Sequence, residues 1–132
     1  MTFGLDTSVV LRLLTGQPQD LAAKALVRYQ DSIAAGDTFS VSDIVAVETY
    51  YAIQHHYGKT KEEALLALKN FSSGEGISFS QNFLSAINTP NTHRARPGFV
   101  DRMLAADYRS KGQITLSCEK SFRRIPDAEV IG

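Results

Sequence analysis

The chain has 132 residues, of which 43 % are hydrophobic and 21 % are charged, and its formal net charge at pH 7 is zero. This length is typical of one domain with a buried core, and the composition argues against a disordered chain and against a membrane-spanning one. The N-terminus carries no basic segment followed by a long apolar run, so we expect a cytoplasmic protein. Cys118 is the single cysteine, which excludes an internal disulfide. We expect it in the core as a small apolar side chain.

The neutral total hides an uneven distribution of charge. Residues 1–90 contain six Lys and Arg against nine Asp and Glu, whereas residues 91–132 contain eight against five. A basic C-terminal surface suits a polyanion such as nucleic acid, although ordinary solvated charges would give the same composition. The basic residues of this part are Arg94, Arg96, Arg102, Arg109, Lys111, Lys120, Arg123 and Arg124.

The first predicted elements are a short strand and a helix that meet at one carboxylate. Residues 2–5 form a largely apolar run, Asp6 follows it, and apolar residues then recur at helical spacing over residues 9–14. Ligands of open α/β sheets bind beyond the carboxyl ends of the strands, so Asp6 stands at a candidate functional position. The alternative is that Asp6, Thr7 or Ser8 only caps the helix.

Apolar periodicity and turn residues predict the remaining elements. Within the helix predicted from residue 43, Ile44, Val47 and Tyr51 share a face. The alternation of strands and helices predicts an α/β fold with a mostly parallel sheet. We expect strands over residues 38–42, 77–79, 113–118 and 128–131, and helices over residues 21–35, 43–53, 60–72, 82–87 and 99–112. The helix from residue 60 is expected to begin with a capping box of Thr60 and Glu63. The helix from residue 99 is expected to turn Val100, Leu104, Ala105 and Tyr108 inward.

Three further carboxylates stand out by position. Glu48 lies in a largely apolar helix, where a charge must be exposed, salt-bridged or bound to a metal. Asp101 falls in the first turn of a predicted helix, and Glu119 follows a late strand. Together with Asp6 they can converge on one edge of the sheet. Without cations such a cluster would repel itself, whereas Mg²⁺ or Mn²⁺ makes it favourable and can position phosphate oxygens and a water.

Four motifs in this order resemble a PIN domain, and most closely the VapC-type ribonuclease toxins of bacterial type II toxin–antitoxin modules. They are Leu5–Val9, Val47-Glu48, Phe99–Ala106 and Leu116–Lys120, which together span nearly the whole chain. The resemblance implies a single PIN-like domain over residues 1–132 with an α/β/α sandwich. It also implies an endoribonuclease that depends on Mg²⁺ or Mn²⁺, an RNA substrate, a cognate antitoxin and a homodimer.

The resemblance also implies roles for individual residues. Asp6, Glu48, Asp101 and Glu119 match the family's catalytic and metal-binding acids. The hydroxyls of Thr7 and Ser8 are expected to orient Asp6, and that of Ser117 to contact a neighbouring carboxylate. For contact with the RNA backbone we expect Arg94, Arg96, Arg102 and Lys120. The apolar helices around Tyr29, Tyr50 and Tyr51 offer surfaces for the antitoxin or the dimer, unless those tyrosines belong to the core.

The fourth acidic position departs from the family pattern. Where the family usually has Thr-Phe-Asp, this chain has Ser117, Cys118 and Glu119. Glutamate keeps the charge but adds a methylene, so its carboxylate reaches a metal differently. An alternative function is therefore a PIN-fold module that binds RNA or protein and has weak or lost nuclease activity. A receiver domain and an Asp-x-Asp phosphatase fit poorly, because Thr7 and Ser8 follow Asp6 where these classes need a second acid.

Overall fold

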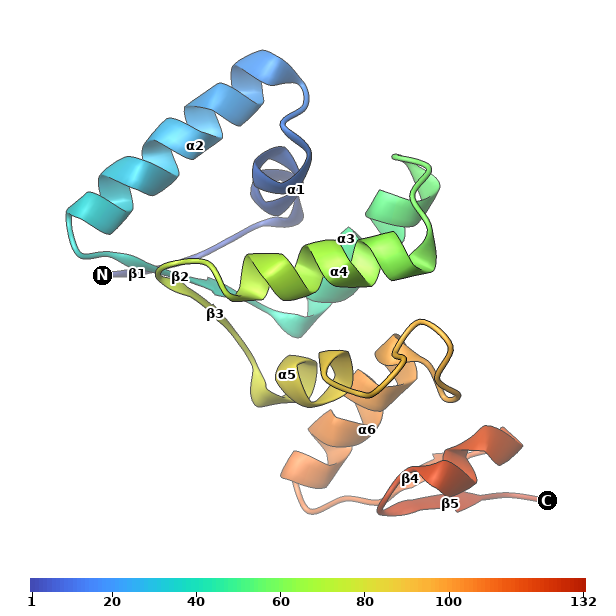
Figure 1. Ribbon diagram of the computed structural model, residues 1–132. Coiled ribbons are helices and arrows are strands. Elements are labelled where there is room, and N and C mark those ends of the chain that lie inside the picture. The colour runs from blue at the N-terminus through green and yellow to red at the C-terminus, as the bar shows by residue number, and fades with distance from the viewer. The chain divides into compact units, whose positions relative to one another are not determined.

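Five short strands, six α-helices and one 3₁₀ helix alternate along the chain (Figure 1). The computed structural model describes residues 1–132 and divides into two compact units, unit 1 over Met1–Ser80 and unit 2 over Gln81–Gly132. None of the helices combines the length and the apolar character that crossing a bilayer requires.

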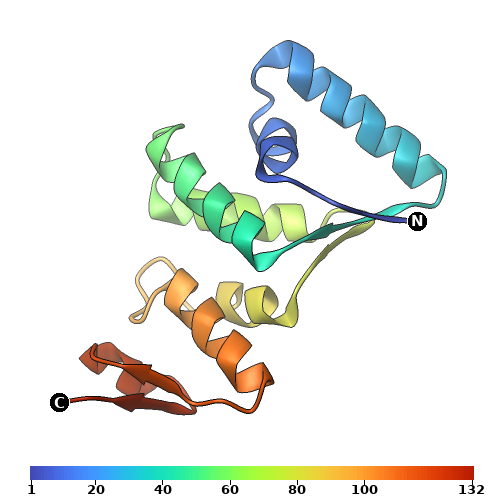
Figure 2. The ribbon, with the colours of Figure 1, turned by 180° about the vertical axis from the view of Figure 1, so that it is seen from behind.

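Unit 1 contains three strands and four helices. They are β1 (Thr2–Gly4), α1 (Thr7–Thr15), α2 (Gln19–Ala34), β2 (Thr38–Val41), α3 (Asp43–His55), α4 (Lys61–Ser72) and β3 (Ile77–Phe79). The strands form one parallel sheet in the order β1-β2-β3. Helix α1 packs against both α2 and α3, and α3 packs against α4, as the two opposite views show (Figures 1 and 2).

One face of the three-stranded sheet is aromatic and is covered by α2. Phe3, Phe39 and Ile77 stand in register on β1, β2 and β3. The ring of Tyr29 on α2 lies 5.5 Å from that of Phe39, and the guanidinium of Arg28 lies 4.9 Å above the ring of Phe3. Burial of these rings fixes the register of the sheet, because a slip by one residue would expose them. It therefore also fixes the level at which the strands end, where Asp6 follows β1.

Gly76 lets the chain pass close to α2 before β3 begins. Its φ of +70° lies in the region that glycine adopts readily, and a Cβ at this position would clash with Ile33 Cδ1. The backbone oxygen of Gly76 accepts a hydrogen bond from the N–H of Phe39, at 2.7 Å. A larger residue here would therefore disturb both the α2 packing and the start of the β2–β3 pairing.

Unit 2 contains two helices, a short parallel sheet and the 3₁₀ helix. They are α5 (Gln81–Ile87), α6 (Phe99–Ser110), β4 (Thr115–Ser117), η1 (Lys120–Arg124) and β5 (Ala128–Val130). Phe83 and Phe99 join α5 to α6 edge to face, with ring centroids 5.7 Å apart. Strands β4 and β5 pair in parallel. A small core of Ala105, Phe122 and Ile125 is packed by Ala128 and Val130 of β5.

The α/β class and the parallel pairing of strands are confirmed, and the predicted elements lie close to their predicted positions. The predictions were wrong in detail at the ends of elements and on some helix faces. Helix α6 ends at Ser110, and Leu104 and Tyr108 on it are exposed rather than inward. Cys118 is also exposed, because it follows β4 outside the core rather than inside a longer strand. No pattern had indicated η1.

Helix α3 shows why periodicity chose the wrong face. Ala46, Thr49, Tyr50 and Ile53 are buried, whereas Ile44 is 73 % exposed and Tyr51 is also exposed. Apolar residues occupy nearly the whole circumference of this helix, so spacing alone could not select the face that contacts α1 and α4. Glu48 lies outside the buried face of α3 and is exposed.

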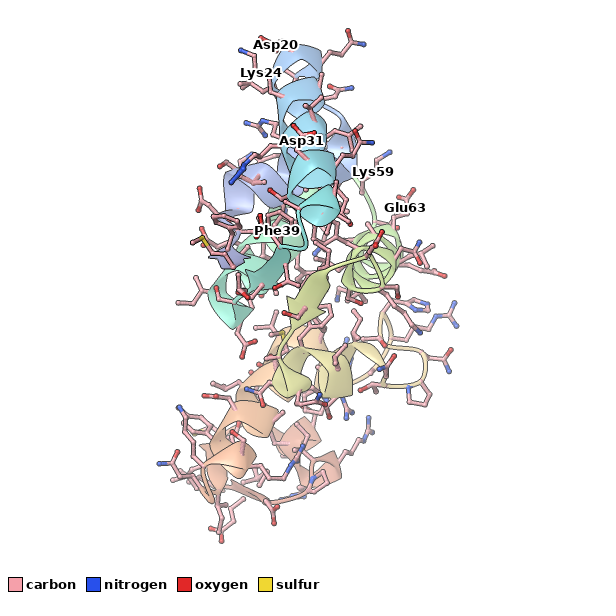
Figure 3. The ribbon with its side chains drawn as sticks, turned by 90° about the vertical axis from the view of Figure 1, so that its left-hand side faces the viewer. Asp20, Lys24, Asp31, Phe39, Lys59 and Glu63 are labelled. Carbon is pink, nitrogen blue, oxygen red and sulfur yellow. The ribbon has the colours of Figure 1, made fainter.

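The start of α4 allows a prediction for stability. Thr60 Oγ1 accepts from the N–H of Glu63 at 3.1 Å, and Glu63 Oε1 accepts from the N–H of Thr60 at 2.9 Å, which confirms the capping box. Figure 3 shows Glu63 at this end of α4, together with Asp20, Lys24 and Asp31 along α2. The hydrogen bonds from the backbone and then the side chain of Thr60 lower the pKa of Glu63 below its ordinary 4.5. The Glu63 carboxylate therefore stabilises the fold above that value and ceases to do so as the pH falls through the lowered pKa.

We expect Glu63→Gln to lower the melting temperature at pH 7, and the difference from the wild type to vanish in acid. Thr60→Ala should cost about 1 kcal/mol in the free energy of unfolding, as typical N-cap losses do. Thermal and urea unfolding at pH 7 and in acid would measure both effects. Asp20→Asn is the control, since Asp20 is also an acid in the first turn of a helix but belongs to no capping box. An equal loss in Asp20→Asn would contradict the role of the box.

Candidate functional site

Asp6 is the N-cap residue of α1, directly beyond the end of β1. Asp6 thus occupies the predicted N-cap position, but its carboxylate makes no capping hydrogen bond to the helix. Instead Asp6 Oδ2 accepts from the hydroxyl of Ser8 at 2.9 Å. Asp6 is exposed and has no ion pair. The Asp6 carboxylate thus has the Ser8 hydroxyl as its partner in place of the helix N–H groups.

Thr7, the residue after Asp6, contacts a second carboxylate, that of Glu48. The Thr7 hydroxyl donates to Glu48 Oε1 at 3.4 Å, a long contact that joins the first residue of α1 to α3. Thr7 was expected to orient Asp6, and the structure gives it Glu48 as partner instead. Since α1 packs on α3, Asp6 and Glu48 belong to the same region of unit 1. Exposure, one of the three possibilities for Glu48, is the one observed, and no Lys or Arg pairs with it.

Asp101 and Glu119 form the acidic pair of unit 2. Asp101 lies in the first turn of α6 and is half-buried, whereas Glu119 is exposed at the N-cap position of η1. Burial first, and then the charge of Glu119, raise the pKa of Asp101 above its ordinary 3.8. The two carboxylates are therefore close enough to repel one another. Neither has a salt bridge to a basic residue.

The side chain of Ser117 holds the backbone at Glu119. The N–H of Glu119 donates to Ser117 Oγ at 3.0 Å, so this hydroxyl binds a backbone group rather than the carboxylate that we expected. A short side-chain turn of this kind is typical of serine near the end of an element. Cys118, between them, is exposed. Ser117 therefore supports the fourth acid indirectly, by holding the chain from which Glu119 extends.

The donor set of the two pairs suits a hard divalent cation. All four groups are carboxylates, the ligands that Mg²⁺ and Mn²⁺ prefer, and none is neutralised by a basic side chain. The raised pKa of Asp101 marks a charge that a cation would stabilise. Asp101 and Glu119 interact in unit 2, whereas Asp6 and Glu48 belong to unit 1, and no group of three or more His, Cys, Asp and Glu side chains forms a potential metal site. Asp107 is separate from these acids, because Lys111 Nζ binds it at 3.1 Å.

The basic residues of unit 2 take different positions from one another. Arg94 and Arg96 are exposed in the segment before α6, and Lys120 is exposed at the start of η1. Arg102 is half-buried, and its Nε donates to the carbonyl oxygen of Pro97 at 2.7 Å. Arg102 is thus engaged with the loop. Arg124 Nη1 donates to the carbonyl oxygen of Arg96 in the same loop, at 3.5 Å, and no sequence motif distinguished Arg124 from the other basic residues nearby.

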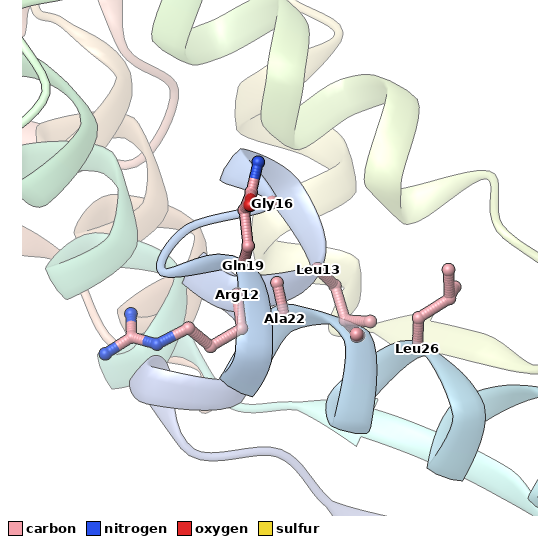
Figure 4. Close-up of a pocket in the computed structure, with 7 residues that line it drawn as sticks. Arg12, Leu13, Gly16, Gln19, Ala22 and Leu26 are labelled. Carbon is pink, nitrogen blue, oxygen red and sulfur yellow. The ribbon is translucent and has the colours of Figure 1, made fainter.

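A second feature of unit 1 is an apolar groove beside α2. Its lining between α1 and α2 includes Arg12, Leu13, Ala22 and Leu26, which Figure 4 shows on these two helices. Leu13 and Leu26 also line the continuation toward α4 and β3, with Tyr29 and Phe71. We call this surface the α2 groove. Tyr29, one of the tyrosines expected at a partner surface, lines it, whereas Tyr50 is buried in the core.

Comparisons with known proteins bear on the whole chain. The PIN domain family model matches residues 4–128. A crystal structure of VapBC2 from Rickettsia felis, bound to a DNA fragment from their promoter, is similar at 20 % identity with a TM-score of 0.41, covering 99 % of this chain and 98 % of that one. No curated protein sequence matches. The family match covers all four acidic positions and both units, so this chain belongs to the PIN domain family.

Proposed function

We propose that this chain is a Mg²⁺- or Mn²⁺-dependent endoribonuclease of the VapC type, in which Asp6, Glu48, Asp101 and Glu119 are the catalytic carboxylates and metal ligands. PIN domains are typically nucleases that use divalent metal ions. The observation that carries the proposal is that four carboxylates at the family's acidic positions have no basic partner. Such charges favour a cation when it is available.

The side chains have separable tasks in this proposal. A divalent ion, when bound, lowers the pKa of water and stabilises charge on phosphate oxygens. Asp6 and Glu48 would hold such an ion with their carboxylates oriented by Ser8 and Thr7. Asp101 and Glu119 supply the remaining negative charge. The half-buried position of Asp101 limits its access to water, which strengthens its attraction to a cation.

The first test is metal-dependent cleavage of RNA. The purified chain, free of partners, should cleave a labelled pool of structured RNA with Mg²⁺ or Mn²⁺ and not with EDTA. Loss of a residue that merely supports a ligand already costs about 10- to 100-fold in activity, so Asp6→Asn should cost more. Asp31→Asn, which removes an exposed aspartate from α2, is the matched control and should cleave normally. Cleavage that persists in EDTA, or in Asp6→Asn with unchanged metal affinity, would contradict the ligand role.

The alternative is an RNA- or protein-binding module whose activity is weak because of Glu119. Glu119→Asp restores the side chain that the family usually has. A large gain in cleavage rate would favour a nuclease impaired by glutamate, and no cleavage by either protein would favour a binding module. For a competent site we expect Glu119→Asp to change the rate only modestly, since the charge is kept and only its reach changes. Single-turnover rates with saturating Mg²⁺ would measure this.

We also propose that the partner is a cognate antitoxin and that it occupies the α2 groove. Leu26 is 47 % exposed in a groove lined by apolar side chains, an arrangement that suits the apolar face of a partner segment. Arg12 lines the same groove and has no ion pair, so it would pair with a carboxylate of that segment.

Leu26→Glu should therefore weaken co-purification with the antitoxin by at least about tenfold, as loss of a central interface side chain does, while RNA cleavage stays unchanged. Leu66→Glu is the control, because Leu66 is 58 % exposed on α4 and does not line the groove. Equal binding of the antitoxin by both variants would show that the α2 groove is not part of the interface. Light scattering on the partner-free chain would test the homodimer, which remains a prediction.

A further inference from the structure

Two arginines from different elements of unit 2 bind one backbone oxygen. Arg102 Nη2 on α6 and Arg124 Nη1 at the end of η1 each donate to the carbonyl oxygen of Arg96, both at 3.5 Å. Arg102 Nε adds the shorter contact to the carbonyl of Pro97, at 2.7 Å. The segment before α6 is therefore held from two sides, and the guanidinium groups of Arg102 and Arg124 meet at one backbone oxygen.

This gathering of positive charge has no counter-charge. None of Arg96, Arg102 and Arg124 has an ion pair with a carboxylate. Because Arg102 and Arg124 share one acceptor, their charged groups lie within two hydrogen-bond lengths of each other and repel. Folding would not favour this arrangement without compensation, and a bound oxyanion is the compensation that guanidinium groups accept best.

The contacts leave most of the donors free. A guanidinium has five N–H donors. Arg124 uses one of them in a contact at the outer limit of hydrogen-bond length, and its side chain stays exposed, as does that of Arg96. Arg102 is half-buried and spends its best contact on the loop. The roles therefore differ, because Arg102 braces the loop while Arg96 and Arg124 retain donors for a ligand.

We propose that Arg96, Arg102 and Arg124 form a phosphate clamp that binds a backbone phosphate of the RNA, with Arg96 and Arg124 as binding residues and Arg102 as a positioning residue. This inference rests on the proposed function and names Arg124 as an RNA-binding residue. Arg102 directly follows Asp101 in α6, and consecutive helical residues point about 100° apart. The clamp therefore receives a phosphate other than the one at the carboxylates and anchors the RNA at a fixed register.

The test separates the clamp from general electrostatic attraction. Binding of a short fluorescein-labelled single-stranded RNA is measured by anisotropy in EDTA at several KCl concentrations, for the wild type, Arg124→Gln, Arg124→Lys and Arg123→Gln. Arg123 is the matched control, since it is exposed, precedes Arg124 and makes no such contact. Arg124→Gln should weaken binding about tenfold, the size of one charge-assisted hydrogen bond. It should also reduce the slope of log K against log salt by about 0.7, the value for one phosphate of a single strand.

The conservative variants distinguish binding from bracing. Arg124→Lys should restore the salt slope and only part of the affinity, because lysine keeps the charge without the fork. Arg102→Lys should raise KM for RNA cleavage and leave kcat unchanged, since it releases the loop but not the carboxylates. Thermal unfolding of each variant checks the fold, and should Arg124→Gln not fold, Arg124→Lys decides. A change in kcat rather than KM in Arg102→Lys would overturn its positioning role.

Each outcome bears on a different proposal. Equal losses in Arg123→Gln and Arg124→Gln, or no loss in either, would overturn the clamp even where the wild type cleaves RNA. Binding that depends on Arg124 in a protein that never cleaves RNA would overturn the nuclease and keep the clamp as the RNA site of a binding module. A wild type that neither binds nor cleaves RNA would overturn both.

Discussion

Repulsion between like charges that the fold holds close together is the constraint on which the functional surface of this chain depends. Asp101 is half-buried and lies near Glu119, and burial together with that neighbouring charge raises its pKa. A sequence selected only for stability would place a lysine or arginine beside such a pair, and unit 2 has enough of them. In the proposed function a cation from solution would complete the pair.

The basic groups of unit 2 show the same constraint with the opposite sign. Arg102 and Arg124 converge on the carbonyl oxygen of Arg96 although carboxylates of the same unit lack partners. Direct pairing of these groups would satisfy both sets and leave nothing for a ligand. Asp101 and Arg102 are adjacent on α6 and make no ion pair, which in the proposed function would leave a place for a metal and a place for a phosphate. Charge separation of this kind lowers stability in the free protein and is characteristic of sites that bind charged ligands.

Much of the fold could be predicted because its signals are local. Spacing of apolar residues located the helices, and the Thr60 and Glu63 pair located the start of α4. The face of α3 could not be predicted, because Ile44 and Tyr51 make its exposed side as apolar as its buried one. Cys118 is exposed because β4 is only three residues long, and strand length depends on pairing with β5 rather than on local sequence.

The acidic site could be predicted only in part, for a similar reason. Residue type and order indicated Asp6, Glu48, Asp101 and Glu119, since a family motif is a property of the sequence. The contacts that support these acids could not be predicted from the sequence, because Thr7 reaches Glu48 only through the packing of α1 on α3. Arg124 is one of several basic residues in the sequence, and only its hydrogen bond to the carbonyl oxygen of Arg96 distinguishes it.

The departure at the fourth acid is better explained as an adjustment than as a loss. Ser117 fixes the backbone of Glu119, so the extra methylene can only be taken up by the side chain. Burial first, and then the charge of Glu119, raise the pKa of Asp101, and a cation bound to both carboxylates would offset their repulsion. A neutral residue at position 119 would relieve this repulsion in the free protein. In the proposed nuclease a bound cation would relieve it instead, so a charged residue at position 119 is consistent with that function.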